Sequence, residues 1–230
     1  MLEERILFAD GEAIVIDKPG GLPVDPPRNG RASVETFIDE LKLGFKMAPV
    51  AMHRLDTDTT GCLLFARNAR ARKTFQAAFE AHGVEKVYLA VVDGICPDDS
   101  GVIDLPLAKF STAAAGWRMV PDDAGKSART HWRRLGTIGE QSLVEFRPET
   151  GRTHQIRVHA ARGLGAAIVG DPVYADRDAD PDQPMLLHAW KLKVPRDPRP
   201  AIDVTAPIPD HFGLFLDFLS EDDDAAAPAL

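Results

Sequence analysis

Short apolar runs ended by turn residues dominate this sequence and limit the folds it can adopt. Residues 62–66 and 87–92 are apolar segments typical of buried strands, and neighbouring segments of this kind are mostly separated by short turns. Regular helical crossovers between them are not evident. The pattern therefore predicts an α+β fold, with a central, mainly antiparallel mixed sheet flanked by helices and loops.

The individual elements are predicted from local signals. Ser33 is expected to cap one helix, Asn68 a second, and Gly83 to end the second. Strands are expected at residues 13–16, 62–66, 87–92, 130–135, 142–146, 186–194 and 202–205, and helices at 33–41, 68–82 and 211–219.

The chain length bounds the domain organisation. A chain of 230 residues, 44% of them hydrophobic, fits one globular domain. We expect this domain over residues 1–219, with 220–230 as an acidic, Ala-rich, disordered tail. About eleven residues precede the first predicted strand, which leaves no room for a separate N-terminal domain. With no signal peptide and no apolar run near the ~20 residues of a membrane span, a cytoplasmic monomer is expected.

Metal and disulfide chemistry is not signalled. Cys62 and Cys96 lie far apart without a CxxC partner, and both are expected to act as small apolar residues. His154 and His159 do not have the spacing of a zinc pair on one helix face. Paired carboxylates such as those in the loop at 56–58 can hold a hard cation, but no further oxygen ligands cluster nearby. We expect neither a metal nor another cofactor.

The charge distribution is uneven. A net charge of -8 speaks against a nucleic-acid binder, because neutralisation of phosphates supplies much of such affinity. Residues 126–162 nevertheless contain eight Lys or Arg against three Glu, and the C-terminus is acidic. This asymmetry is compatible with one phosphate-binding face, and equally with a mixed solvated surface.

Reactive side chains crowd the loop at residues 53–61, HRLDTDTTG. An arginine, two aspartates and three threonines share one connection, and catalytic groups tend to lie on loops held by rigid flanks. The alternative is a turn capped by its own Asp and Thr side chains. A functional site is the favoured interpretation, with Asp56 as its central carboxylate.

A second dense segment, ETGRTHQIRVH, covers residues 149–159. A glycine followed by Thr153, a good N-cap residue, predicts a helix on which Thr153, Ile156 and Arg157 share a face, with Arg152 at the entry. Backbone N–H groups at that entry could hold a phosphate, and Arg157 could grip a carboxylate with two hydrogen bonds. The alternative is a helix with solvated arginines.

Together with four other segments, these two resemble the ordered motifs of the RluA-type family of RNA pseudouridine synthases. DKPGGL at 17–22 resembles the family's NKPxGL, and residues 53–61 resemble its HRLDxxTSG with Thr60 in place of the usual serine. KVYLAVVDG at 86–94 resembles KxYxAxVxG. GRTHQIRVH at 151–159 matches the family pattern, followed by GDPVY at 170–174 and LLHA at 186–189.

The resemblance implies a pseudouridine synthase fold and the isomerisation of uridine in a ribosomal or transfer RNA stem-loop. It implies Asp56 as the catalytic carboxylate, Tyr88 against the target base and Arg157 paired with Asp56. Arg54, together with His53, would fill the gap left by the extruded uridine. The remaining RNA contacts implied are Arg152 and His154, with Lys126, Arg129, Arg133 and Arg134 gripping phosphates.

Two functions of other classes remain open. One is an RNA-binding or ribosome-assembly module on the same scaffold without catalysis. The other is a hydrolase that uses Asp56 and Asp58 with a metal ion. The Asp56, Tyr88 and Arg157 set favours the isomerase, because a pure binder has no need of a carboxylate in a cleft that faces phosphates.

Overall fold

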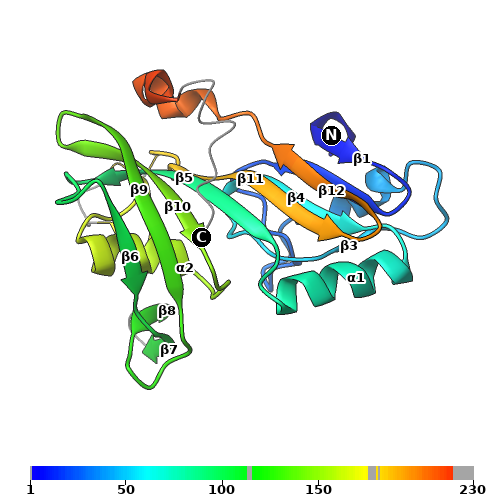
Figure 1. The fold of residues 1–230 in the computed structure, drawn as a ribbon, viewed down its shortest axis with the longest axis horizontal. Coiled ribbons are helices and arrows are strands. Elements are labelled where there is room, and N and C mark those ends of the chain that lie inside the picture. Colours follow the sequence, from blue (N-terminus) through cyan, green and yellow to red (C-terminus); the bar gives the residue numbers. More distant parts are fainter. Residues whose placement is uncertain (1, 113–115, 176–179, 181, 220–230) are drawn as a thin grey trace.

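The computed structural model describes residues 2–112, 116–175, 180 and 182–219, and in these residues a ten-stranded sheet forms the body of the fold (Figure 1). The strand order is β1-β2-β4-β11-β5-β10-β9-β6, with β12 beside β11 and β3 beside β4. β11 and β4 pair in parallel, and the other described pairs of this sheet are antiparallel. The predicted α+β fold with a mainly antiparallel mixed sheet is confirmed.

The elements have the following bounds. The main sheet contains β1 Ile6–Ala9, β2 Ala13–Lys18, β3 Val50–Ala51, β4 Thr60–Ala66, β5 Glu85–Asp93, β6 Ser100–Asp104, β9 Arg129–Ile138, β10 Gln141–Pro148, β11 Leu187–Arg196 and β12 Arg199–Thr205. A separate hairpin is formed by β7 Leu107–Thr112 and β8 Gly116–Pro121. The helices are α1 Ala69–Glu80 and α2 Gln155–Val158, the 3₁₀ helices Glu3–Arg5, Val34–Leu41 and Asp210–Phe218, and a π-helix His159–Leu164.

β4 lies at the centre of the core. All seven of its residues are buried, which explains why its sequence is apolar throughout rather than alternating. Its second residue, Gly61, has a φ of 103°, and a Cβ there would lie 2.2 Å from the Ala189 carbonyl oxygen. Only glycine therefore lets β4 approach β11 at the point where the chain leaves the loop at residues 53–59.

The predicted helix starts are confirmed at two positions. Ser33 occupies the N-cap of Val34–Leu41, and its backbone N–H donates to Thr36 Oγ1 at 3.0 Å. Asn68 caps α1, where its Oδ1 accepts the Ala71 N–H at 2.9 Å. Two of the predicted helices have 3₁₀ rather than α geometry, and Gly213 interrupts the last one with a non-helical backbone.

Other predictions about the chain were wrong. β1 pairs with β2 ahead of the strand taken as the first, so strand structure begins at Ile6. The helix expected to start from Thr153 begins at Gln155, because His154 takes a left-handed backbone with a φ of 54°.

The expected tail, residues 220–230, lies outside the described residues. Among the residues described, none of the helices is long and apolar enough to cross a membrane.

Two apolar clusters on the sheet leave a half-buried tyrosine between them. One cluster is built around Phe146 and Ile156, and the other around Leu63 and Phe65. Tyr88 of β5 packs against both. Because alternate residues of a strand share a face, Tyr88 and Ala90 lie on the same side of the sheet, beside α2.

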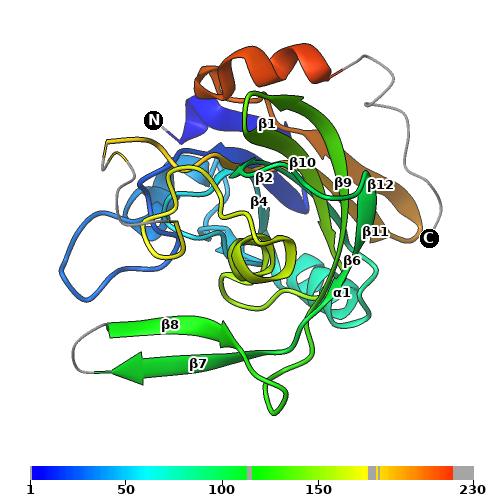
Figure 2. The ribbon, with the colours of Figure 1, turned by 90° about the vertical axis from the view of Figure 1, so that its left-hand side faces the viewer.

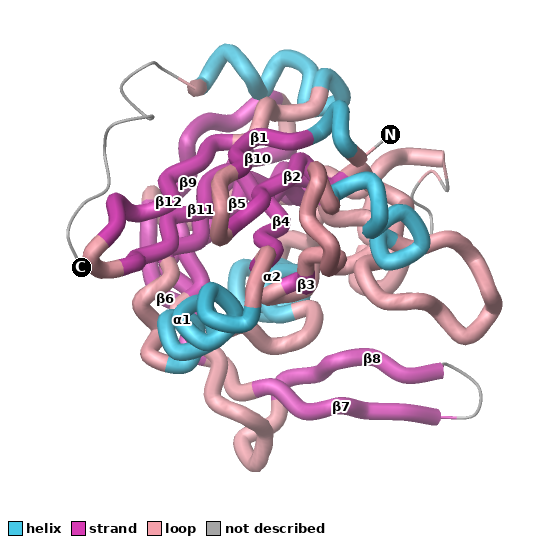
Figure 3. The backbone as a smooth tube through the Cα atoms, turned by 90° about the vertical axis from the view of Figure 1, so that its right-hand side faces the viewer, coloured by secondary structure: helices cyan, strands magenta, loops and turns pink. Residues whose placement is uncertain are grey.

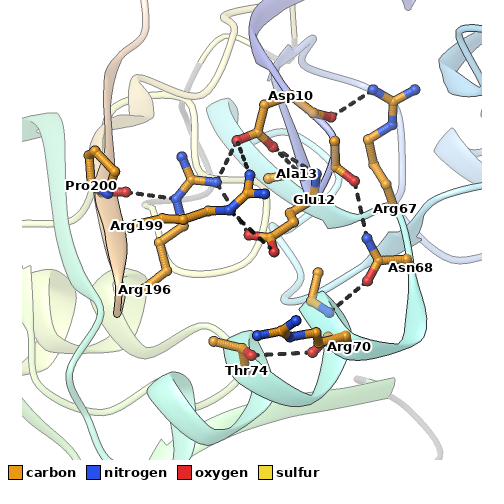
Figure 4. Close-up of polar contacts among 12 residues, drawn as sticks. Asp10, Glu12, Ala13, Arg67, Asn68, Arg70, Thr74, Arg196, Arg199 and Pro200 are labelled. Atoms are coloured by element: carbon orange, nitrogen blue, oxygen red, sulfur yellow. Dashed lines mark hydrogen bonds and ion pairs between the residues drawn. The ribbon is translucent and has the colours of Figure 1, made fainter.

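A polar network connects the β1–β2 turn to the end of β11 (Figure 4). Asp10, in the turn between β1 and β2, accepts the backbone N–H groups of Glu12 and Ala13 at 2.8 Å through Oδ1. Its Oδ2 accepts from Arg196 of β11 at 2.5 Å, and its carbonyl accepts from Arg67 at 2.7 Å. The turn, the β11 end and the residues that lead into α1 are thus held together by one aspartate.

Replacing this aspartate is expected to destabilise the fold. Asp10→Ala leaves two backbone donors without their acceptor and removes the closer carboxylate partner of Arg196, which keeps Glu12 at 3.7 Å. The free energy of unfolding should therefore fall by about 2–4 kcal/mol in urea titrations. Asp39→Ala is the control, since Asp39 is an exposed partner of Lys42 and should cost under about 1 kcal/mol. Equal effects of the two variants would contradict this role of Asp10.

Candidate functional site

An open cleft of about 1270 Å³ lies over the sheet beside Tyr88. Its walls come from the loop at 53–59, from β5, from the segment at 148–157 that leads into α2, and from the β7–β8 hairpin. Small-molecule pockets usually have about 300–1,000 Å³. The cleft is therefore large enough for a segment of a large ligand.

Asp56 and Arg157 meet in this cleft. Arg157 Nη1 donates to Asp56 Oδ2 at 3.0 Å, although the two residues are 101 positions apart in the chain. The Asp56 side chain is 25% exposed, whereas that of Arg157 is 5% exposed. The pairing of Arg157 with Asp56 that the sequence predicted is present, and it leaves the carboxylate accessible from the cleft.

Asp171 holds Arg157 from the other side. Arg157 Nε and Nη2 donate to the two oxygens of Asp171 at 2.7 and 2.8 Å, and Asp171 Oδ1 also accepts the N–H groups of Val173 and Tyr174. Burial by itself would lower the pKa of Arg157, but the hydrogen bonds and charges of Asp171 and Asp56 raise it. The guanidinium is therefore fixed in direction and permanently charged.

Lys18 anchors the loop that carries Asp56. This lysine is fully buried, and its Nζ donates to the carbonyl oxygens of Pro19, Leu22 and Thr57 at 2.7 to 2.9 Å. Burial lowers the pKa of Lys18 to about 8. Three acceptors require three N–H hydrogens, so the contacts themselves favour the ammonium form at neutral pH. The residue following Asp56 is thus tied to the end of β2.

Tyr88 lines the same cleft as Asp56 and Arg157. It lies opposite Phe146 of β10 and Ala189 of β11 in the sheet, and its side chain lines the cleft. Burial, and after it the negative charge of Asp56, raise the pKa of Tyr88 above its ordinary value. The phenol is therefore protonated at neutral pH and can donate a hydrogen bond.

His154 lies on the opposite wall, next to the hairpin. Its Nε2 is 3.9 Å from Asp56 Oδ2, and its Nδ1 is 2.9 Å from the hydroxyl of Tyr174. The ring of Trp117, from β8, lies 5.1 Å from the His154 ring between centroids. Burial lowers the pKa of His154, although the nearby negative charge of Asp56 acts in the opposite direction. The lowered pKa favours a neutral ring.

His53 and Arg54, the two residues before Leu55, have different surroundings. His53 Nε2 accepts the Leu64 N–H at 3.1 Å, and its ring packs against Phe79. Burial lowers the pKa of His53 to about 3, so its ring is neutral. Arg54 is exposed at the cleft wall and donates to Asp25 at 2.9 Å. His53 thus supports the start of β4, whereas Arg54 is available to a ligand.

At the predicted helix entry, the backbone N–H groups of Arg152 and Gln155 are bonded within the protein. The Arg152 N–H donates to Gln155 Oε1 at 2.9 Å, and the Gln155 N–H donates to the Arg152 carbonyl. α2 itself has only four residues. The Arg152 side chain still lines the cleft, where its Nε donates to the Ser127 carbonyl at 2.9 Å.

Four cations predicted to grip phosphates, here called the basic block, lie outside the cleft walls: Lys126, Arg129, Arg133 and Arg134. Arg133 sits opposite Glu145 in the sheet and bonds to it at 3.3 Å; Glu145 points away from the face that holds Phe146. Arg134 pairs with Asp99. Cleft cations come instead from Arg54, Lys86, Lys109, Arg152 and Arg157. Lys126, Arg129, Arg133 and Arg134 are thus not among the lining residues.

No role was predicted from the sequence for Asp171 or for the β7–β8 hairpin. Asp171 stood in the quoted GDPVY element, but its grip on Arg157 depends on how the turn packs against α2. The hairpin residues are mostly exposed on both faces, so they lack the alternation that marks a half-buried strand. Aromatic and β-branched residues such as Phe110, Trp117 and Val120 were the available signal.

Ligands for a metal ion do not gather in the cleft. In the described ranges, no group of three or more His, Cys, Asp or Glu could hold a metal ion. Cys62 and Cys96 are both buried, and burial raises the pKa of the Cys62 thiol to about 12. Both thiols thus pack in the interior.

Acidification is expected to destabilise the fold through buried histidines. Burial lowers the pKa of His53 to about 3 and that of His188, which bonds Thr60, to about 4. Below the ordinary histidine pKa of about 6.5 the unfolded chain binds more protons, so stability is lost as pH falls through that value. From pH 7 to pH 5 each histidine should cost about 2 kcal/mol in urea titrations.

Two variants test whether these histidines cause the loss of stability at low pH. His188→Gln should remove about half of this loss, because His53 still contributes the other half, whereas His82→Gln, at an exposed histidine, should leave the pH dependence unchanged. Constant stability of the unsubstituted chain between pH 7 and pH 5 would contradict the prediction.

Comparisons with known proteins agree on one family. The sequence model described as RNA pseudouridylate synthase matches residues 12–162. The chain is similar to an uncharacterized RNA pseudouridine synthase of Zymomonas mobilis, with 49% identity over 92% of this chain and 97% of the relative. It is also similar to the ribosomal large subunit pseudouridine synthase D of that organism, with 36% identity over 74% of this chain, but spans only 55% of that relative.

Solved structures show the same likeness. Human RNA pseudouridylate synthase domain containing 4 superposes with a TM-score of 0.78 and 25% identity, covering 94% of this chain and 93% of that one. Human RNA pseudouridylate synthase domain containing 1 gives a TM-score of 0.73 and 28% identity, covering 88% and 82%.

Proposed function

The chain belongs to the RNA pseudouridylate synthase family, and on that premise we propose that Asp56 is the carboxylate with which it isomerises a specific uridine in structured RNA. The family reaction breaks the bond between C1′ of the ribose and N1 of the uracil, and joins C1′ to C5. The proton leaves C5 and N1 gains one, so the net reaction needs no cofactor.

The observation that carries this proposal is the fixed carboxylate pair around Arg157. Arg157 donates to Asp56 Oδ2 at 3.0 Å, and His154 Nε2 faces the same oxygen at 3.9 Å. Oδ1 is then the oxygen that can face the ribose of a uridine in the cleft. Arg157 keeps the carboxylate ionised and oriented, whether Asp56 attacks C1′ or promotes loss of a C2′ proton.

Tyr88 is proposed to contact the uracil. Its protonated phenol lies at the floor of the cleft, where it can stack on the base and donate a hydrogen bond to a uracil oxygen. A base that has detached from its ribose must turn over without leaving. The two apolar clusters on either side of Tyr88 provide walls that confine it.

Arg54 is proposed to replace the uridine in the RNA stack. Extrusion of a base costs a few kcal/mol, and a planar guanidinium can fill the gap. Arg54 is exposed, and its ion pair with Asp25 at 2.9 Å is one that RNA phosphates can displace. His53, whose ring bonds the β4 backbone, contributes by holding this loop in place.

A ribosomal RNA stem-loop is the proposed substrate class. Several relatives at 32–36% identity are named ribosomal large subunit pseudouridine synthase D. We extend only this substrate class to the chain. The particular RNA and the particular uridine are not carried over from the relatives. Mapping pseudouridines in total RNA with and without the gene tests it, and a lost site in transfer RNA alone would contradict it.

Asp56→Asn is expected to abolish turnover. Tritium release from RNA labelled at uracil C5 should fall at least about a thousandfold, equivalent to about 4 kcal/mol of transition-state stabilisation. RNA binding should persist, because the amide keeps the shape of the side chain. Retained release in this variant would remove Asp56 from its role.

Asp58→Asn serves as the matched control in the same loop. Within the described part of the chain, the side-chain hydrogen bonds of Arg157 go to Asp56 and Asp171, so the Asp58 variant should retain most of the tritium release. Loss in both variants, together with sensitivity to a chelator, would favour the hydrolase with a metal ion. Normal cellular function from the Asp56→Asn protein would favour the module without catalysis.

The salt dependence of RNA binding tests where phosphates are held. Each phosphate contact contributes about 0.7 to 0.9 to the slope of log affinity against log salt. Arg152→Gln, in the cleft, should lower the magnitude of the slope by about that amount, whereas Lys73→Gln, exposed on α1, should not change it. A reduced slope in Arg133→Gln would show that RNA reaches beyond the cleft to the basic block.

A further inference from the structure

The β7–β8 hairpin stands apart from the main sheet but is joined to the Asp56 site by two contacts. Figures 2 and 3 show the hairpin projecting away from the other strands. The Met119 N–H of β8 donates to the hydroxyl of Tyr174 at 3.0 Å, and the Trp117 ring packs on His154. Both contacts end on residues that lie next to Asp56 or Arg157.

The direction of these hydrogen bonds can be worked out from the donors. A backbone N–H can only donate, so the Tyr174 oxygen accepts from Met119. The Tyr174 hydroxyl hydrogen is then free to donate to His154 Nδ1 at 2.9 Å. A neutral imidazole that accepts at Nδ1 carries its hydrogen on Nε2. Nε2 is the nitrogen that faces Asp56.

His154 and Asp56 are close but not hydrogen-bonded, so the distance between them can shorten. The separation of 3.9 Å between Nε2 and Oδ2 exceeds a hydrogen bond by about 1 Å. His154 has a left-handed backbone with a φ of 54°, so its ring direction is set by its neighbours rather than by a regular helix. A small movement of Trp117 or Tyr174 would therefore bring His154 onto Asp56.

The outer surface of the hairpin has the chemistry of an RNA contact. Trp117 is 47% exposed, and the ammonium of Lys109 lies 5.1 Å from its ring centroid. Exposed aromatic rings stack on nucleobases, and neighbouring cations bind phosphates. Trp117 thus offers one part of its ring to a ligand while the ring also contacts His154.

We infer that Tyr174 and His154 are positioning residues through which RNA bound on the hairpin aligns the Asp56 carboxylate for reaction. The inference rests on the proposed function, because it requires an RNA substrate and a catalytic Asp56. Tyr174 is central: its ring lies 5.3 Å from the Arg157 guanidinium, while its hydroxyl contacts both Met119 and His154. The hairpin is therefore linked to both Arg157, which bonds Asp56 Oδ2, and His154, which faces it at 3.9 Å.

Tyr174→Phe tests this link by removing one hydroxyl while keeping the ring. The rate of tritium release in a single turnover at saturating RNA should fall about tenfold, as expected for one lost hydrogen bond near the reacting group. The dissociation constant for RNA should stay within about twofold. His154→Asn, which tolerates the left-handed backbone, should have a similar effect. Because the two residues act as one unit, the double variant should be about as slow as either single variant.

Ser142→Ala is the matched control, because Ser142 is a buried residue whose hydroxyl donates to the Gly94 carbonyl at 2.8 Å outside the cleft. It should lower the melting temperature without changing the single-turnover rate. A tenfold slower rate in this control would assign the loss to general destabilisation and overturn the inference.

Three further results would overturn it. One is a Tyr174→Phe rate within twofold of the unsubstituted enzyme, and another is additive losses in the double variant. The third is weaker RNA binding in place of a slower rate, which would make His154 and Tyr174 direct RNA contacts. Tritium release by the unsubstituted enzyme and its loss in Asp56→Asn are measured first, so that failure of the proposed function is recognised separately.

Discussion

The site depends on the placement of one buried cation between two carboxylates. An uncompensated guanidinium with Arg157's burial would be very costly, and Asp171 compensates it with two parallel hydrogen bonds. The third donor of the same side chain reaches Asp56. Because Asp171 fixes the guanidinium, the position of Asp56 is defined from the protein interior while its carboxylate remains accessible. An exposed arginine would hold the same carboxylate loosely, since surface ion pairs contribute little.

The sheet brings these groups together from distant parts of the chain. Lys18 at the end of β2 holds the loop before β4, and Gly61 lets that strand lie against β11. β5 with Tyr88 is the next strand along, and β10 leads into α2 with Arg157. The loop before β4 thus supplies the carboxylate, β5 the phenol, and α2 after β10 the guanidinium. A sheet of this order explains why the residues with chemistry are spread over more than 100 positions and still share one cleft.

Sequence patterns predicted the parts whose surroundings are apolar or locally determined. The runs at 62–66 and 87–92 are buried in the sheet and were recognised as strands, and Asn68 was recognised as a cap because its partner is three residues away. The pairing of Arg157 with Asp56 was anticipated from the family resemblance. Asp171 was not, since its two hydrogen bonds depend on tertiary packing. The helix start was misplaced because His154, an unusual residue for a left-handed backbone, occupies the cap.

The overall charge of the chain also misleads about its ligand. A net charge of -8 repels RNA at long range, and the cleft itself is lined by acids as well as cations. Arg157 is committed to Asp56 and Asp171, so the cations left for a phosphate are Lys86, Lys109, Arg152 and, once its exposed pair with Asp25 opens, Arg54. Many cations of the basic block are neutralised by partners, as Arg133 is by Glu145 and Arg134 by Asp99. What governs RNA affinity is the local set of cations that a phosphate can reach, within a Debye length of about 8 Å at physiological salt. On the proposed function, RNA would therefore be held where these cations are accessible and repelled over the acidic remainder of the surface.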